Sequence, residues 1–592
     1  MKRHIKTTYC VLVMLACASA YADDLLHADT IIVTATRTEI PLRDATVPVS
    51  VITREDIELS LATDLAELLR FEAGVDIGRN GGPGQATSLF LRGTESNHTL
   101  VLVDGVRINP GTLGGAAIQH VAPEVIERIE IVKGARSSLF GTDAIGGVIN
   151  IITRRADSAY VEGSVGAGSF DSRTGFVSGG NRGDDYEFGA TFNWQDTDGY
   201  AQRTDSDVVR GYDNISANLY AQRTFRSTDI GLRHWRAEGN VEYLNFLPAP
   251  VDQDYENSVT ALELSTRWSE AGNSKLVLSH MSDDIRQNQS PDFVESSRFS
   301  VDWQYSHAFD RHTVTAGIYA VEEDAETLSF GSGFDEDTTT RAVFVQDQWS
   351  RDRHTAFLAL RLSDHDAFGN HTTWNSEYAF AINDAWTFNA GIGHAMRAPD
   401  ATDRFGFGGN PDLDPELADE AQLGLRFAPD GRHSVDFELY ANDVKDLIEF
   451  DFETSTLANI DEAEIRGGQL GYEYRGAAFS VRVDLVKQSA DNKLTGARLL
   501  RRAEETATLS YTQNIGKHRL GFSVLASGDR VDFGDVSLPG YVLANLSGQF
   551  ALGEHLQAHA RIENLLDTEY QTAANYRMQE RSVFVELKYA WR

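Results

Sequence analysis

The feature that most constrains the fold of this chain is a repeated alternation of apolar and polar residues that begins after residue 155. In the segment 186–195 every second side chain is apolar, and several of these apolar side chains are aromatic. The same period of two recurs in the segments 434–441, 479–486 and 555–562. Segments of roughly ten residues with one apolar and one polar face, separated by turn residues, are typical of transmembrane β-barrels.

A closed barrel is also the only sheet that pairs every backbone group in lipid, because it has no edge strand. A soluble β-sandwich alternates as well, but its polar face would not be paired so regularly with an aromatic-rich face. We therefore expect residues 156–592 to form an all-β membrane domain.

The first 22 residues are typical of an export signal peptide. Three basic residues open the chain: Lys2, Arg3 and Lys6. An apolar stretch at 9–16 follows, and Ala20-Tyr21-Ala22 offers a small-x-small cleavage site. Ala18-Ser19-Ala20 is a second possible site, and acylation of Cys17 is a weaker alternative, because the residues before it match the lipidation pattern poorly.

Cys10 and Cys17 are the only cysteines in the sequence, so cleavage after the signal leaves a chain that forms no disulfide. No later stretch approaches the ~18–20 continuous apolar residues of a transmembrane helix. The chain is therefore expected to leave the cytoplasm, and helices are not expected to hold it in a membrane.

A small α/β unit is predicted between the signal and the alternating region. Three β-branched runs are bounded by turn-forming Gly, Asp or Asn residues: Thr99–Val103, Ile129–Val132 and Val148–Ile152. Upstream, Thr53-Arg54-Glu55-Asp56 resembles a capping box that begins a helix. A second helix is predicted over Thr63–Phe71, with Leu65, Leu68 and Leu69 on the face that packs into the core.

Particular residues of this unit resemble the plug domain of TonB-dependent outer-membrane receptors: Leu91-Arg92-Gly93, Val103-Asp104-Gly105-Val106 and the run from Gly134 to Asn150. The resemblance continues to the C-terminus. It implies an all-β membrane protein of a Gram-negative outer membrane, with a 22-stranded transmembrane β-barrel at 156–592. An N-terminal α/β plug domain, at 41–155, would lie inside the barrel lumen.

The same resemblance implies contact with outer-membrane lipid and insertion by the barrel-assembly machinery. That machinery recognises a closing strand, which matches the alternation from Val583 to Trp591. Arg592 follows the last aromatic residue here, whereas family members usually end on it.

A β-prone segment near the expected mature N-terminus, within residues 23–40, is similar to the TonB box of these receptors: Asp29, Thr30, Ile31, Ile32, Val33, Thr34 and Ala35. The resemblance implies that the TonB energy-transducing protein of the inner membrane captures this segment as an added strand. Strand addition suits such a role, since main-chain hydrogen bonds give affinity without a deep pocket. The alternative is a first structural strand of the plug.

Two further runs look most like the cobalamin receptors within this family: Asn80-Gly81-Gly82-Pro83-Gly84-Gln85 and Leu499-Leu500-Arg501-Arg502-Ala503. The resemblance implies that six positions touch the ligand: Ala86, Ser88, Glu95, Leu113, Gly114 and Arg501. Ala86 and Glu95 differ in side chain from the residues expected there. The function this implies is active, transducer-coupled import of cobalamin or another large, scarce nutrient. A receptor for a ferric siderophore or another metal chelate is the alternative.

The net charge of −35 gathers in acidic runs such as Asp205-Ser206-Asp207 and Asp252-Gln253-Asp254. Such runs either form a solvated surface or bind a divalent cation. The resemblance implies structural calcium in the outer loops, at Asp205, Asp207, Asp213 and Asp254. Ala201 stands where an aspartate is expected, which makes this the least supported part of the resemblance.

Several classes of function are disfavoured. A nucleic-acid binder would need a basic footprint, which this acidic chain lacks. The sequence shows no Gly-x-Ser-x-Gly and no His-Glu-x-x-His motif, so no catalytic residue is assigned and the chain is not expected to be an enzyme. A passive porin would lack the plug and the transducer segment, and a surface adhesin would not need that segment.

Overall fold

The computed structural model describes residues 32–33, 37–38, 40–41, 45–47, 49–245, 247–451, 454–460 and 462–591. The expected signal peptide, residues 1–22, lies outside the described residues, and so does Arg592. Five residues of the expected transducer segment also lie outside them: Asp29, Thr30, Ile31, Thr34 and Ala35.

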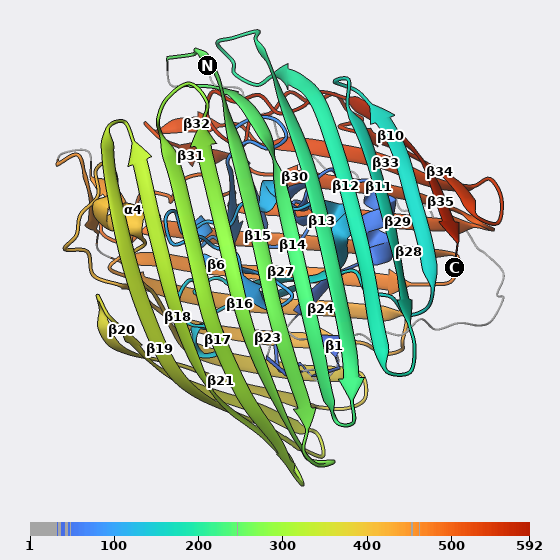
Figure 1. Cartoon of the computed structure of the whole chain (residues 1–592), viewed down its shortest axis with the longest axis vertical. Helices are drawn as coiled ribbons and strands as arrows, with labels where there is room; N and C mark the ends of the chain where they lie inside the picture. Colours follow the sequence, from blue (N-terminus) through green and yellow to red (C-terminus); the bar gives the residue numbers. More distant parts are fainter. Residues whose placement is uncertain are drawn as a thin grey trace, which may run out of the picture.

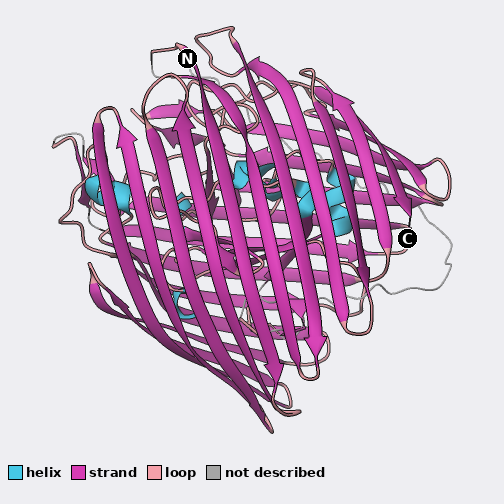
Figure 2. Ribbon diagram, in the orientation of Figure 1, coloured by secondary structure: helices cyan, strands magenta, loops and turns pink. Residues whose placement is uncertain are grey.

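The described part of residues 156–592 forms one closed antiparallel barrel of 22 strands (Figures 1 and 2). The first and last strands close it, with Val161 opposite Trp591 in register, so the predicted closing strand is confirmed. The barrel strands are β10 Tyr160–Gly168, β11 Arg173–Arg182, β12 Tyr186–Ala201, β13 Val209–Phe225, β14 Thr228–Leu244, β15 Pro250–Arg267, β16 Gly272–Gln287, β17 Phe293–Phe309, β18 His312–Ser329, β19 Ser332–Arg351, β20 His354–His365, β21 Gly369–Ala381, β22 Trp386–Arg397, β23 Glu416–Phe427, β24 His433–Lys445, β27 Ala463–Arg475, β28 Phe479–Asn492, β29 Glu505–Ile515, β30 His518–Ser527, β33 Tyr541–Ala551, β34 Leu556–Glu563 and β35 Ser582–Trp591.

The period of two places apolar side chains on the outer face and polar ones on the inner face. On β12, Phe188, Phe192 and Trp194 are all exposed, whereas Thr191 and Asn193 between them are buried. Large apolar side chains on an outer face lower the free energy only when lipid covers them, so the pattern defines a membrane-spanning wall. Within the described residues, no helix is long and apolar enough to cross a membrane.

The two ends of the barrel differ in the length of their connections. At one end the strands are joined by short turns, of which the longest is 428–432. At the other end lie five long loops: 398–415, 446–462, 493–504, 528–540 and 564–581. Because barrels of this kind have short periplasmic turns and long extracellular loops, we call the long-loop end the outer face. The outer loops carry helix α4 (Ala401–Phe405) and two small hairpins, β25–β26 (Ile448–Asp451, Thr456–Asn459) and β31–β32 (Arg530–Asp532, Val536–Leu538).

Inside the barrel lies an α/β plug built on a five-stranded sheet (Figure 1). The sheet order is β3 (Val49–Thr53), β8 (Ile126–Lys133), β9 (Gly147–Thr153), β6 (Thr99–Val103) and β7 (Val106–Arg107). Strands β6, β8 and β9 confirm the three strands predicted from β-branched runs. The turn from β6 to β7 is Asp104-Gly105, and both residues have positive φ, as a two-residue hairpin turn of this type requires.

The remaining plug elements are the hairpin β4–β5 (Val75–Arg79, Thr87–Leu91), helices α1 (Arg54–Ser60), α2 (Leu65–Leu69) and α3 (Ser137–Phe140), and three short 3-10 turns at Ser96–His98, Ile118–His120 and Pro123–Val125. The predicted capping box at Thr53 is confirmed. Helix α2 is shorter than the predicted Thr63–Phe71. The Asp64 side chain accepts from the Glu67 amide and caps the helix, so it begins at Leu65, and it ends at Leu69. Leu65, Leu68 and Leu69 are buried as predicted.

Buried ion pairs fix the plug against one side of the wall. Arg92 pairs with Glu438 on β24 and lies 3.6 Å from Glu420 on β23. Arg136 pairs with Glu377 on β21 at 2.8 Å. Buried pairs are costly to break, since removing one partner leaves an uncompensated charge, so these contacts set the orientation of the plug.

On the other side, the plug meets the wall through apolar and aromatic contacts. The plug core packs against lumen-facing Trp235, Val259 and Met281. His120 stacks on Tyr255, with ring centroids 3.6 Å apart, and its Nδ1 lies 3.2 Å from the Tyr212 hydroxyl. Burial lowers the pKa of His120 from 6.5 to about 3, so the ring is neutral at physiological pH.

This neutral histidine predicts a pH dependence of plug stability. In an unfolded plug His120 takes up a proton below pH 6.5, whereas the folded plug resists protonation down to about pH 3. Stability should therefore fall as the pH drops below 6.5, by up to about 1.4 kcal/mol per pH unit. The His120→Phe variant keeps an aromatic ring but cannot titrate. Thermal unfolding at pH 7 and pH 5 should show a larger acid shift for the wild type than for this variant, and equal shifts would contradict the assignment.

Candidate functional site

Three plug loops reach the outer face of the barrel. They follow β4, β5 and β7 and cover residues 80–86, 92–98 and 108–117. The first loop approaches the wall so closely that Gly84 has no room for a side chain: a Cβ there would collide with Cδ2 of Tyr212, and φ is +72°. The Gln85 amide donates to the carbonyl of Glu242 on β14 at 2.8 Å, which holds the loop against the barrel rim.

The first group of sequence-predicted ligand positions lies around this loop. Ala86 is exposed, and its carbonyl accepts from the Asn80 amide at 3.0 Å. Ser88 pairs with Gly78 in the β4–β5 hairpin, and Cδ of Arg501 is 3.5 Å from where a Gly78 Cβ would stand. Arg501 is held in turn by an ion pair to Asp532, 2.8 Å from its Nε. The structure thus brings Ser88 and Arg501 to the same part of the outer face.

The second group lies on the other two plug loops. Glu95 forms an ion pair with Arg502, which also donates to the carbonyl of Gly93 at 2.9 Å. Leu113 is 51% exposed, although it is a large apolar side chain. Gly114 is buried in a left-handed conformation, and a Cβ there would lie 2.9 Å from Oδ2 of Asp400 in the loop 398–415.

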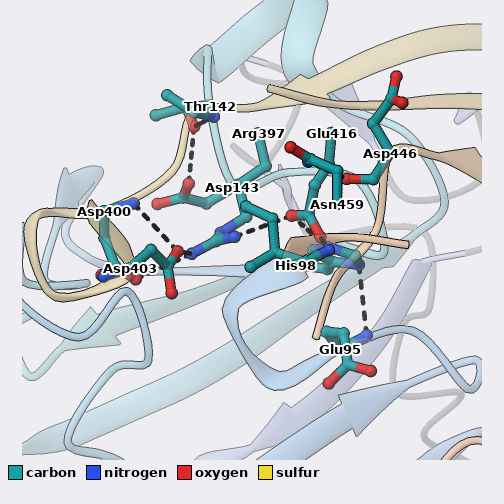
Figure 3. Close-up of polar contacts among 12 residues, drawn as sticks. Glu95, His98, Thr142, Asp143, Arg397, Asp400, Asp403, Glu416, Asp446 and Asn459 are labelled. Carbon is teal, nitrogen blue, oxygen red and sulfur yellow. Dashed lines mark hydrogen bonds and ion pairs between the residues drawn. The ribbon is translucent and has the colours of Figure 1, made fainter. Parts of the chain in front are cut away.

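Arg397, at the end of β22, joins this loop to the start of β23 (Figure 3). Its Nη2 lies 2.8 Å from Asp400 and 2.5 Å from Asp403, and its Nη1 lies 2.8 Å from Glu416 at the start of β23. The guanidinium is almost fully buried, so each of these contacts is shielded from water. Burial and the neighbouring Asp403 carboxylate raise the pKa of Asp400, and Arg397 opposes that rise.

Glu416 carries the connection onward to the plug and to a second outer loop. Its Oε2 lies 3.0 Å from Nε2 of His98, whose Nδ1 faces the Glu95 amide at 3.3 Å (Figure 3). Its Oε1 accepts from the backbone amide of Ile448 at 2.9 Å. Glu416 therefore links the loop 398–415, the loop 446–462 and the plug loop that carries Glu95.

Sequence reasoning missed this network. No sequence pattern singles out Arg397 or Glu416. No motif marks His98 either, although it contacts Glu416. A buried Arg beside three acidic residues has no local spacing rule, so no sequence signal identifies its partners.

The four aspartates predicted to bind calcium do not face a common point. Asp205 pairs with Arg203 at 2.7 Å, and Asp207 lies 3.7 Å from Arg577. Asp254, on β15, accepts from the Asn240 side-chain amide at 2.8 Å, and Asp213 is on β13, two strands away. Among the described residues, no group of three or more His, Cys, Asp or Glu side chains is arranged to hold a metal ion. Calcium binding here stays a prediction.

A closed 22-stranded barrel, an internal plug and an outer face built from both define a plugged barrel receptor of the transport type. The family model "TonB dependent receptor-like, beta-barrel" matches residues 138–565, and the model "TonB-dependent Receptor Plug Domain" matches residues 41–148. The chain belongs to the TonB-dependent receptors, a family of transporters and receptors. The predicted fold class and family are thereby confirmed.

Proteins similar to this chain include a vitamin B12 transporter and siderophore receptors. The chain is 30% identical over 574 residues to "Vitamin B12 transporter BtuB" of Vibrio vulnificus (strain YJ016), which covers 93% of each chain. Among solved structures, the siderophore receptor PirA from Acinetobacter baumannii superposes with a TM-score of 0.78 and 19% identity, over 92% of this chain and 98% of PirA. A mutant of the ferric enterobactin receptor PfeA from Pseudomonas aeruginosa, in complex with enterobactin, superposes with a TM-score of 0.80 and 17% identity. The match covers 93% of this chain and 100% of PfeA.

The Arg397 network makes a prediction about the outer loops. Replacing Arg397 with Gln leaves the buried Glu416 carboxylate and the partly buried carboxylates of Asp400 and Asp403 without their shared cation, at a cost of about 3–5 kcal/mol. The loop 398–415 should then detach from the plug and become sensitive to protease added to intact cells. Arg426→Gln is the control, because its pair with Asp436 is half-exposed and 3.8 Å long. Equal protease resistance of the two variants would contradict the role of Arg397.

Proposed function

We propose that this protein imports cobalamin or a related corrinoid across a Gram-negative outer membrane, with energy supplied through a TonB-type transducer. The observation that carries the choice of ligand is the 30% identity over 574 residues with a vitamin B12 transporter. The siderophore receptors that resemble the chain are 19% and 17% identical and share the fold alone. A ferric siderophore or another metal chelate is therefore the alternative ligand.

The outer face suits a large ligand with both apolar and polar parts. Leu113 and Ala86 present apolar surface, and Glu95, Ser88 and Arg501 supply hydrogen-bonding groups around it. Plug loops and barrel loops both contribute residues to this face, so a ligand that contacts all of them bridges the plug and the barrel. Such a ligand shifts the plug only if it binds two plug states with different affinity, because uniform binding shifts no equilibrium.

Coupling to the transducer is proposed to act through the N-terminal segment. Ile32 and Val33 form strand β1 (Ile32–Val33), which pairs with β2 (Ile40–Pro41), with Ile32 opposite Pro41. These two described residues of the segment are therefore extended and paired as a strand. A transducer strand that pairs with the edge held by β2 would have to displace β2.

Binding of purified protein to cyanocobalamin and to a ferric siderophore tests the choice of ligand directly. The proposal expects saturable binding of the corrinoid and none of the chelate. The reverse result would replace cobalamin with the alternative.

A proline in the N-terminal segment tests the coupling step. The Ile32→Pro variant removes a backbone donor and fixes φ in the strand that the transducer should capture. Uptake of radiolabelled cyanocobalamin by cells should collapse, while binding at the cell surface stays near the wild-type value. Equal loss of binding and uptake would mean instead that the segment is structural.

A bulky residue in the third plug loop tests the ligand site. In Gly114→Leu the new Cβ already meets Asp400 at 2.9 Å, so the loop must move and affinity for cyanocobalamin should fall by about tenfold or more. Gly115→Leu is the matched control, since a Cβ there meets nothing closer than 3.8 Å. The placement of the loop at the ligand is wrong if both variants bind as tightly as the wild type while their barrels assemble normally.

A further inference from the structure

A cavity of about 1180 Å³ lies between the plug and one side of the barrel wall, and its lining reaches the short-turn end of the barrel at Arg226 and Ser227. Its plug face includes Leu102, Val106 and Asn150, on strands β6, β7 and β9 of the five-stranded sheet. Its wall face runs over β11 to β18 and includes Ser265, Lys275 and Asp302. Figure 1 shows these wall strands side by side in front of β6. The volume exceeds the ~300–1,000 Å³ of common small-molecule sites, so a large solute fits.

The plug is tied firmly to the wall away from this cavity. Ion pairs join it to β21, β24, β28, β34 and β35, through Glu377, Glu438, Arg482, Arg561 and Lys588. On the cavity side, the described residues that precede the barrel form two ion pairs with strands β13 to β18. Asp104 pairs with Arg233 at 3.5 Å, and Arg37 pairs with Asp302 at 2.7 Å. Separating the plug from the barrel wall therefore costs less electrostatic energy on the cavity side than on the opposite side.

The seal between the cavity and the outer face is mainly apolar. Trp235, Val259, Ala261 and Met281 of the wall pack there against the plug core, and Met281 also lines the cavity. Apolar contacts are not directional, so surfaces can slide across one another without leaving an unpaired charge. The N-terminal segment also reaches this side, because Arg37 and Thr38 both line the cavity.

The charge of the cavity differs from that of the whole chain. Ten basic and seven acidic side chains line it, a net charge of +3, whereas the chain carries −35. Arg155, Arg226 and Arg267 are among the lining residues, and within the described chain none of them forms an ion pair. A basic lining with uncommitted guanidinium groups attracts phosphate or carboxylate groups.

From these observations we infer that the cavity is a transit site, where substrate is held after it passes the plug and before it leaves the barrel. Substrate moves between the β6–β7 edge of the plug and wall strands β14 to β17. The site accepts a large solute that bears an anionic group. This inference rests on the proposed import function and adds to it a path and a chemical preference.

A thiol label placed in the cavity tests the path. Because the only cysteines are Cys10 and Cys17, Ser265→Cys supplies a single thiol to the barrel, and it can be coupled to a bulky maleimide. Ser510→Cys is the matched control, since this lumen strand, β29, lies on the opposite wall and Ser510 does not line the cavity. The modified Ser265→Cys protein should bind cyanocobalamin at the cell surface normally but lose uptake to the level of Ile32→Pro.

The result separates the two proposals. Uptake by fully labelled Ser265→Cys protein at the rate of labelled Ser510→Cys protein would overturn the transit site, provided that the wild type imports cyanocobalamin. Failure of the unlabelled wild type to bind or import cyanocobalamin would instead overturn the proposed ligand. Repeating the labelling with a ferric siderophore as the probe then tests the path independently of that ligand.

Charge variants test the chemical preference. Arg226→Gln and Arg267→Gln together should lower the maximal uptake rate of cyanocobalamin, which carries a phosphodiester, with unchanged affinity at the cell surface. Uptake of cobinamide, a corrinoid without that phosphodiester, should be unaffected. Arg311→Gln, in a turn at the same end but outside the cavity lining, is the control. If all variants take up cyanocobalamin at the same rate, or if the uptake of both corrinoids slows equally, the hypothesis that the cavity prefers an anionic group is wrong.

Discussion

Hydrogen bonds between β10 and β35 close the barrel, and the rest of the structure depends on this closure. In lipid an unpaired strand edge would cost several kcal/mol for each unsatisfied group, so a sheet of this length is stable there only as a ring. A ring of 22 strands encloses a lumen too wide for side chains to fill. The plug occupies that lumen, and the outer site exists because plug loops and barrel loops meet at one rim.

The plug and the barrel are held together by two kinds of contact that behave differently. Arg92 and Arg136 bind carboxylates of the wall in buried pairs, which resist separation. His120 and the apolar core meet the opposite wall through stacking and burial, which tolerate small displacements. At the outer rim, Arg397 and Glu416 extend the ionic contacts to two long loops. A ligand bound there would touch groups whose positions depend on how the plug sits.

Much of the fold could be predicted from sequence, because it is specified by local patterns. The period of two identified the wall, and Asp104-Gly105 and the run Val148–Ile152 identified plug strands. The number of strands came only from family resemblance. The site was less predictable, since Arg397 and Glu416 are 19 residues apart and His98 is 318 residues from Glu416. The start of α2 was placed too early at Thr63, because Asp64 caps the helix and its first residue is Leu65. The calcium aspartates share a region, but Arg203 and Arg577 meet two of them.

The uneven attachment of the plug has a mechanical consequence. Arg37, the described residue that follows the expected transducer segment, is bound to β17, off the axis of the barrel and on the weakly attached side. A force applied along a central axis would load every contact at once, and all of them would have to break together. A force applied at one margin loads only the nearest contacts and breaks them in sequence, so the plug peels from the wall. Peeling needs a smaller peak force than shearing, and the ion pairs of Arg92 and Arg136 on the far wall would then serve as a hinge that keeps the plug in the barrel.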